Sequence, residues 1–184
     1  CGPAKAADEA AIFWASDPIR PGQTAMIVGS GFSTESRVDI GLLFDPGMVP
    51  GISGDVLGTG RMYVLTPPGM DFGRREALRI EDLAGHPFIS LDRRGPLGRL
   101  LLKRLQTTAV ELNTVAYAET YHVAKSMVAH GAGVTVADGI TARSRVHENV
   151  RAWPLEPELK FRVSVVHADS APLSLVARSF IDEL

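Results

Sequence analysis

The sequence predicts an α/β fold, because short β-branched runs alternate along the chain with segments whose apolar residues recur every three or four positions. This alternation begins at Val38 and continues through the rest of the sequence. The chain has 184 residues, of which 45% are hydrophobic, and this is enough apolar material for one core or two small lobes. We therefore expect an α/β protein of one or two compact lobes.

The first 37 residues do not follow this alternation. Residues 12–15 and 24–28 are short apolar runs, and the turn between them contains two prolines and a glycine. Gly29 and Gly31 end the second run. The pattern predicts a hairpin or two sheet edges.

From residue 38 onward, strands and helices are expected in turn. The expected strands are 38–43, 61–66, 87–91, 112–118, 133–136 and 161–167. Three helical faces are expected, carried by Leu97, Leu100, Leu101 and Leu105, by Val123, Met127 and Val128, and by Leu173, Val176, Ala177, Phe180 and Ile181. Residues 81–85 predict one helical turn that Gly85 stops.

The glycine-rich residues 47–60 predict a loop or crossover rather than a strand or helix. We therefore expect one lobe to combine residues 38–66 with 141–184 and the second lobe to comprise residues 67–140. Residues 1–37 are expected to be an N-terminal extension, either native to the domain or a foreign β-hairpin.

Charge and composition exclude several classes of protein. The formal net charge is −2 and the charges are scattered, so direct nucleic-acid contact by this chain is not expected. No apolar run approaches the roughly 20 residues that cross a bilayer, which predicts a soluble chain without membrane contact. Cys1 is the only cysteine, which predicts no disulfide framework and fits a reducing, cytoplasmic compartment. Cys1-Gly2 before a polar stretch also resembles a lipidated surface protein, but a chance first residue of a trimmed chain is favoured.

Five segments carry a resemblance to a known family. They are Val38-Asp39-Ile40-Gly41, residues 60–69 (GRMYVLTPPG), residues 80–89 (IEDLAGHPFI), residues 124–136 (AKSMVAHGAGVTV) and Pro172-Leu173-Ser174 before an amphipathic helix. In order and spacing they resemble the effector-binding domain of LysR-type bacterial transcription regulators. The segment at 80–89 is the most specific of the five.

The resemblance implies two α/β lobes like those of type 2 periplasmic binding proteins, joined by two crossover strands. It implies a small-molecule effector in the cleft between them, no enzymatic activity and no cofactor. Closure around the effector would move DNA-binding helix-turn-helix domains that this chain lacks, in a homodimer or homotetramer of the full protein. Residues 88–94 and 96–98 resemble the branch that responds to opines and basic amino acids.

Two departures from the family accompany the resemblance. The family's first lobe begins with further strands and helices that residues 1–37 are too few to supply, so a truncated first lobe is expected. Instead, Pro21-Gly22-x-Thr24 and residues 27–32 are similar to the first hairpin of an immunoglobulin-like TIG module. Gly69-Met70-Asp71-Phe72 also differs from the family's usual sequence after this glycine.

Polar residues at or just after the ends of predicted strands are the candidates for effector binding. A carboxylate effector needs fixed donors, which arginine forks and helix N-termini provide. The alternative for the arginines is a solvated surface role, and for the threonine plain helix capping. The expected effector-binding residues are Ser90, Asp92, Arg93, Arg94, Thr120, Tyr121 and Asp138.

Enzyme and metal sites have little support in the sequence. Gly29-Ser30-Gly31 follows a strand, but Thr34 takes the place of a third glycine and no helix follows to receive a phosphate. The five histidines lack zinc-site spacing, so no metal is expected. No Gly-x-Ser-x-Gly nucleophile motif occurs.

Three functions remain open from the sequence. The first is the ligand-sensing domain of a regulator, binding a small carboxylate or amino-acid-like effector. The second is an extracytoplasmic solute-binding lipoprotein anchored through Cys1. The third is a fragment with no autonomous function, and weak effector affinity is expected if half of the first lobe is missing.

Overall fold

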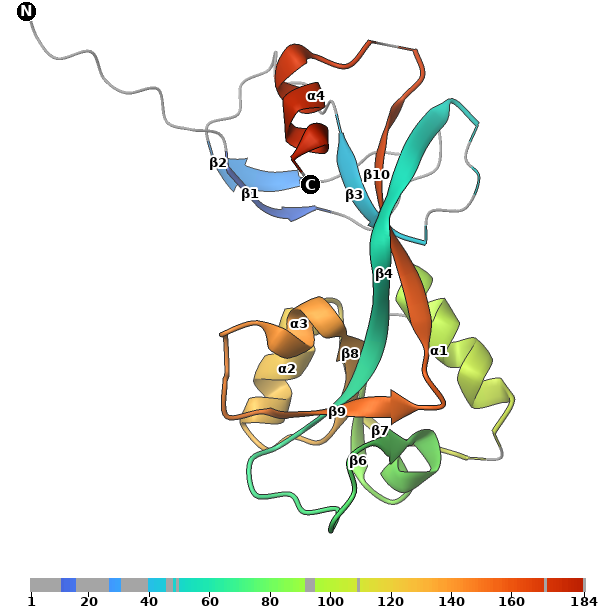
Figure 1. Cartoon of the computed structure of the whole chain (residues 1–184). Helices are drawn as coiled ribbons and strands as arrows, with labels where there is room; N and C mark the ends of the chain where they lie inside the picture. Colours follow the sequence, from blue (N-terminus) through green and yellow to red (C-terminus); the bar gives the residue numbers. More distant parts are fainter. Residues whose placement is uncertain are drawn as a thin grey trace, which may run out of the picture. The chain divides into compact units, whose positions relative to one another are not determined.

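The computed structural model describes residues 11–15, 27–30, 40–45, 48, 50–91, 95–108, 110–170 and 172–183, the first two ranges as backbone only (Figure 1). The chain divides into two compact units. Unit 1 comprises Cys1–Leu57 and Ser164–Leu184, and unit 2 comprises Gly58–Val163. Strands β4 (Ile52–Thr66) and β10 (Lys160–Ala168) each contribute residues to both units.

Unit 1 contains an antiparallel pair of strands, part of a second sheet and a C-terminal helix. Strands β1 (Ala11–Ala15) and β2 (Ile27–Ser30) pair antiparallel, which confirms the expected hairpin pairing. The likeness of residues 21–32 to a TIG module stays a prediction. Strand β3 (Gly41–Phe44) is the neighbour of β10, and β10 is the neighbour of β4.

The expectation of a loop at 47–60 was wrong, because β4 already begins at Ile52. Glycine signals close approach here rather than a turn. A Cβ on Gly54 would lie 2.1 Å from the carbonyl oxygen of Val165, so only glycine lets β4 and β10 come this close.

Helix α4 (Leu175–Asp182) confirms the expected C-terminal helix. The side chain of Ser174 caps it by accepting the backbone N–H of Ala177 at 3.2 Å. The predicted apolar face is not buried as expected, since Ala177 is buried but Val176 is 81% exposed.

Unit 2 is built around strands that run in the order β7, β6, β8, β4, β9 and β5. Strands β6 (Pro87–Leu91) and β7 (Asn113–Ala118) are parallel. Strand β8 (Thr135–Asp138) follows on the other side of β6, where Phe88 and Val134 form a parallel bridge. Strand β8 then pairs antiparallel with β4.

Two strands of unit 2 were not expected from the sequence. Strand β9 (Arg151–Glu156) pairs antiparallel with β4 and parallel with β5 (Leu78–Arg79). The expected lobe boundaries, at 66–67 and 140–141, fall inside unit 2. The division into functional lobes therefore stays a prediction.

Helices cover the parallel strands of unit 2, and Figure 1 shows α1 (Pro96–Gln106) and α2 (Tyr121–Ala129) on opposite sides of them. Both helices were expected. The buried face of α2 differs from the expected one, because Ala124, Lys125 and Val128 are buried whereas Val123 is 50% exposed. A five-residue helix, α3 (Gly139–Arg143), was not expected.

The expected helical turn near residue 81 is a 3-10 helix, η1 (Ile80–Leu83). Leu83 is fully buried, and the Asp82 carboxylate accepts the Arg79 N–H at 2.8 Å and pairs with Arg75. The Asp-Leu pair that characterises this segment thus fixes the turn that leads into β6. Among the described residues, no helix is long and apolar enough to cross a membrane.

Candidate functional site

Three parallel strands of unit 2 end at the same edge. Their last residues are Leu91 of β6, Ala118 of β7 and Asp138 of β8. In open parallel sheets, ligands bind outside the carboxyl ends of the strands, where the loops and the first turns of the following helices supply donors. We refer to this part of unit 2 as the carboxyl edge.

Three of the residues expected to bind an effector lie at or beside this edge. Ser90 is buried, and its hydroxyl donates to the Leu91 carbonyl oxygen at 3.3 Å. Thr120 confirms the expected helix cap, because its hydroxyl oxygen accepts the Val123 N–H at 3.3 Å. The half-buried Tyr121 packs against the core cluster that also contains Leu91. The structure thus brings Ser90, Thr120 and Tyr121 to the strand ends.

Asp138 also lies at the carboxyl edge, where it caps α3. One carboxylate oxygen accepts the N–H groups of Ile140 and Thr141 at 2.9 and 2.8 Å. The other accepts the Thr141 hydroxyl at 2.8 Å, and Asp138 is only 2% exposed. Both oxygens are therefore engaged by the helix that follows.

Asp92, Arg93 and Arg94 lie outside the described residues, so their place at the site stays a prediction. The neighbouring Gly95 and Pro96 begin α1, with Pro96 in the first turn, where its missing N–H leaves no bond unmade.

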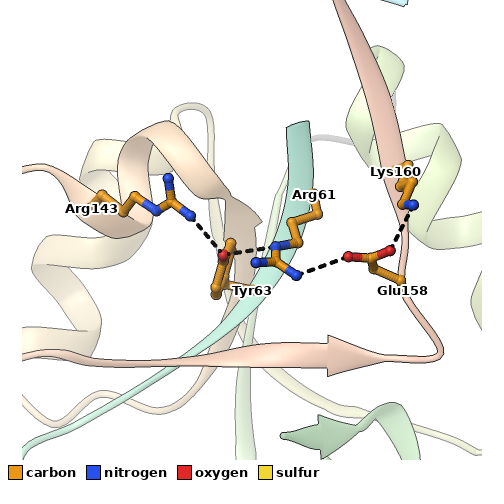
Figure 2. Close-up of polar contacts among 5 residues, drawn as sticks. All are labelled: Arg61, Tyr63, Arg143, Glu158 and Lys160. Atoms are coloured by element: carbon orange, nitrogen blue, oxygen red, sulfur yellow. Dashed lines mark hydrogen bonds and ion pairs between the residues drawn. The ribbon is translucent and has the colours of Figure 1, made fainter. Parts of the chain in front are cut away.

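A cluster of polar side chains at the same edge was not expected from the sequence (Figure 2). Strand β4 carries Arg61 and Tyr63 to the carboxyl edge, because Met62 lies opposite Asp138 in the pairing with β8. The Arg61 guanidinium donates to the Tyr63 hydroxyl oxygen at 3.0 Å, and Arg143 donates to the same oxygen at 3.1 Å. We call Arg61, Tyr63 and Arg143 the arginine–tyrosine cluster.

Packing holds the tyrosine ring in place. Tyr63 is only 7% exposed and belongs to the same buried cluster as Leu91 and Ala118, which end β6 and β7. A Cβ on Gly139 would lie 3.1 Å from the ring, so glycine lets α3 begin close to it. The Arg61 and Arg143 guanidinium carbons lie 5.7 and 5.9 Å from the ring centroid, within cation–π range.

Two ion pairs connect the cluster to the turn between β9 and β10. The Glu158 carboxylate pairs with Arg61 and with Lys160, each at 2.9 Å. Lys160 and Arg61 together lower the pKa of Glu158, which stays ionised near neutral pH. Within the described part of the chain, Arg143 has no carboxylate at ion-pair distance.

The environment of the tyrosine favours negative charge on its oxygen. Burial by itself raises the pKa of Tyr63, but the hydrogen bonds from Arg143 and Arg61 outweigh burial and lower this pKa below its usual 10.0. Arg61 and Lys160 share the Glu158 carboxylate, whereas Arg143 donates to Tyr63 and has no carboxylate at ion-pair distance among the described residues. The cluster thus forms an electropositive part of the edge.

A groove of about 320 Å³ lies between α1 and strands β6 and β7. Its lining is mostly apolar, and Ser90, Gln106, Glu111 and Thr114 supply polar groups. Most of its wall is formed by Phe88, Leu91, Leu101, Leu102, Leu105, Val110 and Leu112. Among the described residues, no group of three or more His, Cys, Asp or Glu side chains could hold a metal ion.

Comparisons with known proteins give a consistent family. The sequence model described as the LysR substrate binding domain matches residues 33–184. The HTH-type transcriptional regulator DgcR of Pseudoalteromonas sp is 29% identical over 150 residues, covering 82% of this chain and 52% of that protein. The chain thus spans about half the length of the curated relative it matches.

Solved structures share the fold. The regulatory domain of Synechocystis PCC6803 CcmR in complex with 2-PG matches with a TM-score of 0.67 at 15% identity, covering 79% of this chain and 71% of that chain. The effector binding domain of QuiR in complex with shikimate matches with a TM-score of 0.66 at 16% identity, covering 78% of this chain and 68% of that chain. At these identities the matches show the fold alone.

Proposed function

Because this chain belongs to the LysR substrate-binding domain family, with residues 33–184 matched, we propose that it is the ligand-sensing part of a bacterial transcription regulator. The complete protein would be cytoplasmic and would contact DNA through a helix-turn-helix domain, as a homodimer or homotetramer. The matched relative DgcR is a transcriptional regulator, which favours this function over an enzyme and over a solute-binding lipoprotein.

The observation that carries the proposal is the carboxyl edge of unit 2. Parallel strands β6, β7 and β8 end there together, and α1 and α2 begin there. Helix N-termini present unbonded N–H groups and a favourable dipole to an anion. The Thr120 hydroxyl accepts from the backbone, so its own hydrogen is left to donate to a ligand.

The proposed effector is a small carboxylate or amino-acid-like molecule. The solved relatives CcmR and QuiR hold 2-PG and shikimate, which are small molecules, and this supports an effector of similar size. Arg93 and Arg94 would bind the carboxylate through their guanidinium forks, and Ser90, Asp92, Thr120, Tyr121 and Asp138 would line the site. Opines and basic amino acids are the first effectors to test.

A thermal-shift screen of the 184-residue chain against amino acids, opines and aromatic carboxylates tests the proposal. A ligand at 100 times its Kd raises the stability of the folded state by about 2.7 kcal/mol, which is readily measured as a rise in Tm. The Arg93→Ala and Arg94→Ala variants should lose the shift, whereas the control Arg74→Ala, at an exposed position between β4 and β5, should retain it. A cooperative transition that no compound shifts would contradict a sensor function for this chain.

A further inference from the structure

We propose that the arginine–tyrosine cluster is an oxyanion-binding subsite that takes a carboxylate or phosphate oxygen of the effector. This inference rests on the proposed sensor function and adds residues to the site that lie on β4 and α3, apart from Arg93 and Arg94. The geometry in Figure 2 points to it, because two guanidinium groups from distant segments meet at one phenol oxygen.

Tyr63 has one hydrogen-bond donor that remains unused. A phenol offers one O–H donor and an acceptor oxygen, and here the oxygen already accepts from Arg61 and Arg143. Its own hydrogen has no acceptor among the described residues, although the residue is only 7% exposed. An incoming oxygen atom beside the hydroxyl would therefore accept from Tyr63 and lie near both guanidinium groups.

Charge favours an anion over a neutral acceptor. Arg143 lacks a carboxylate partner within the described part of the chain, while Arg61 shares Glu158 with Lys160. Asp138, the carboxylate at the end of the adjacent strand, is already engaged by α3. An oxyanion would supply the negative charge that these groups lack, through charge-assisted hydrogen bonds.

The arginine–tyrosine cluster shares a buried core with residues of the proposed sensor site. Tyr63 packs in the same buried cluster as Leu91 and Ala118, and Tyr121 packs against that cluster. The phenol and the residues at the ends of β6 and β7 thus share one packed core in unit 2. An effector held at this edge would present its oxyanion to the arginine–tyrosine cluster.

The test is a titration of the 184-residue chain followed by NMR of tyrosine labelled with ¹³C at Cζ. Acetate and inorganic phosphate are added in separate arms at constant ionic strength, with chloride as the reference. The chain has three tyrosines, and Tyr63→Phe identifies the signal of Tyr63. A Cζ shift of Tyr63 that saturates with either oxyanion, but not with chloride, is the expected result, and the two arms distinguish carboxylate from phosphate.

Three variants separate a binding subsite from a structural network. Arg143→Gln should raise the Kd of the oxyanion roughly tenfold, because a charge-assisted hydrogen bond is lost. Arg145→Gln removes the same charge from an exposed position two residues away and should change the Kd less than about twofold. Glu158→Gln should lower the Kd severalfold, because it frees Arg61 from a competing carboxylate.

Equal effects of Arg143→Gln and Arg145→Gln, or no saturable shift of Tyr63 with either oxyanion, would overturn the subsite. The two proposals fail separately. An effector from the thermal-shift screen that binds wild type and Arg143→Gln equally well would overturn the subsite and leave the sensor function standing. Saturable oxyanion binding at Tyr63, without any effector in the screen, would support the subsite and count against the sensor function.

Discussion

Alanine substitutions at Gly131 and Gly133, two residues apart in the turn between α2 and β8, should destabilise unit 2 by very different amounts. Both glycines have positive φ angles, +79° at Gly131 and +152° at Gly133. A Cβ on Gly131 would meet no atom within 4 Å. A Cβ on Gly133 would lie 2.3 Å from the carbonyl oxygen of Pro87 in β6.

The magnitudes follow from these surroundings. Gly131→Ala adds only the strain of a left-handed backbone, about 1–2 kcal/mol. Gly133→Ala adds overlap with a carbonyl that accepts the Val134 N–H at 2.8 Å. Overpacking of this kind costs roughly 1–3 kcal/mol and a lost hydrogen bond about 1 kcal/mol more. Together with the backbone strain, the free energy of unfolding should therefore fall by about 3–6 kcal/mol in Gly133→Ala.

Urea unfolding followed by tryptophan fluorescence measures the difference. Trp153 is 2% exposed in unit 2, and replacing the second tryptophan, Trp14, with phenylalanine in every variant leaves Trp153 as the sole reporter. Equal unfolding midpoints for Gly131→Ala and Gly133→Ala would refute the reasoning. Equal midpoints would mean that β6 and β8 do not lie this close together. The structural basis for the carboxyl edge would then be removed.

Three further predictions concern other parts of unit 2. Lys125→Met should lower the free energy of unfolding by on the order of 3 kcal/mol, measured by denaturant unfolding. The buried ammonium of Lys125 donates to the carbonyl oxygens at the end of α3, and its loss leaves these oxygens unsatisfied. Asp82→Asn should cost about 1 kcal/mol at neutral pH, and this difference should vanish on acidification. Burial raises the pKa of Asp82, but the bonds from Arg75 and Arg79 outweigh it and hold the pKa below its usual 3.8. The contribution is therefore present above pH 3.8 and is lost as the pH falls through the folded-state pKa, so a difference that persists at pH 2 would contradict this. Absorbance titration at alkaline pH should show Tyr63 ionising below pH 10.0. Arg143→Gln should raise the pKa of Tyr63. An unchanged titration curve in this variant would show that Arg143 does not stabilise the phenolate.

The fold class and most of the parallel core could be predicted from the sequence, because their signals are local. Strand β6 begins and ends as expected, at Pro87 and Leu91, since a β-branched and aromatic run is bounded by turn residues. The helix stop at Gly85, which has a φ of +80°, and the N-cap at Thr120 were also visible as short-range patterns. The family resemblance rests on the same kind of local, ordered signal.

Strands β5 and β9 and the start of β4 could not be predicted in the same way. Pro154 lies within β9, and glycines occur throughout the first half of β4, so local propensity argues against a strand at both places. What makes them strands is pairing with distant segments, since β9 finds partners in both β4 and β5. Backbone hydrogen bonds between remote segments leave no pattern in either segment alone.

The same difference between local and long-range signals separates the residues of the candidate site. Residues at or just after strand ends, such as Ser90 and Thr120, could be named as candidates because strand ends in a parallel sheet share one edge. The arginine–tyrosine cluster could not, because Tyr63 and Arg143 are 80 positions apart and meet only after β4 pairs with β8 and α3 follows. The sequence by itself thus determined the α/β class and the family, and it predicted candidate binding residues at the strand ends. Only the tertiary structure decided which side chains meet there, because the contacts depend on the pairing of strands that are far apart in the chain.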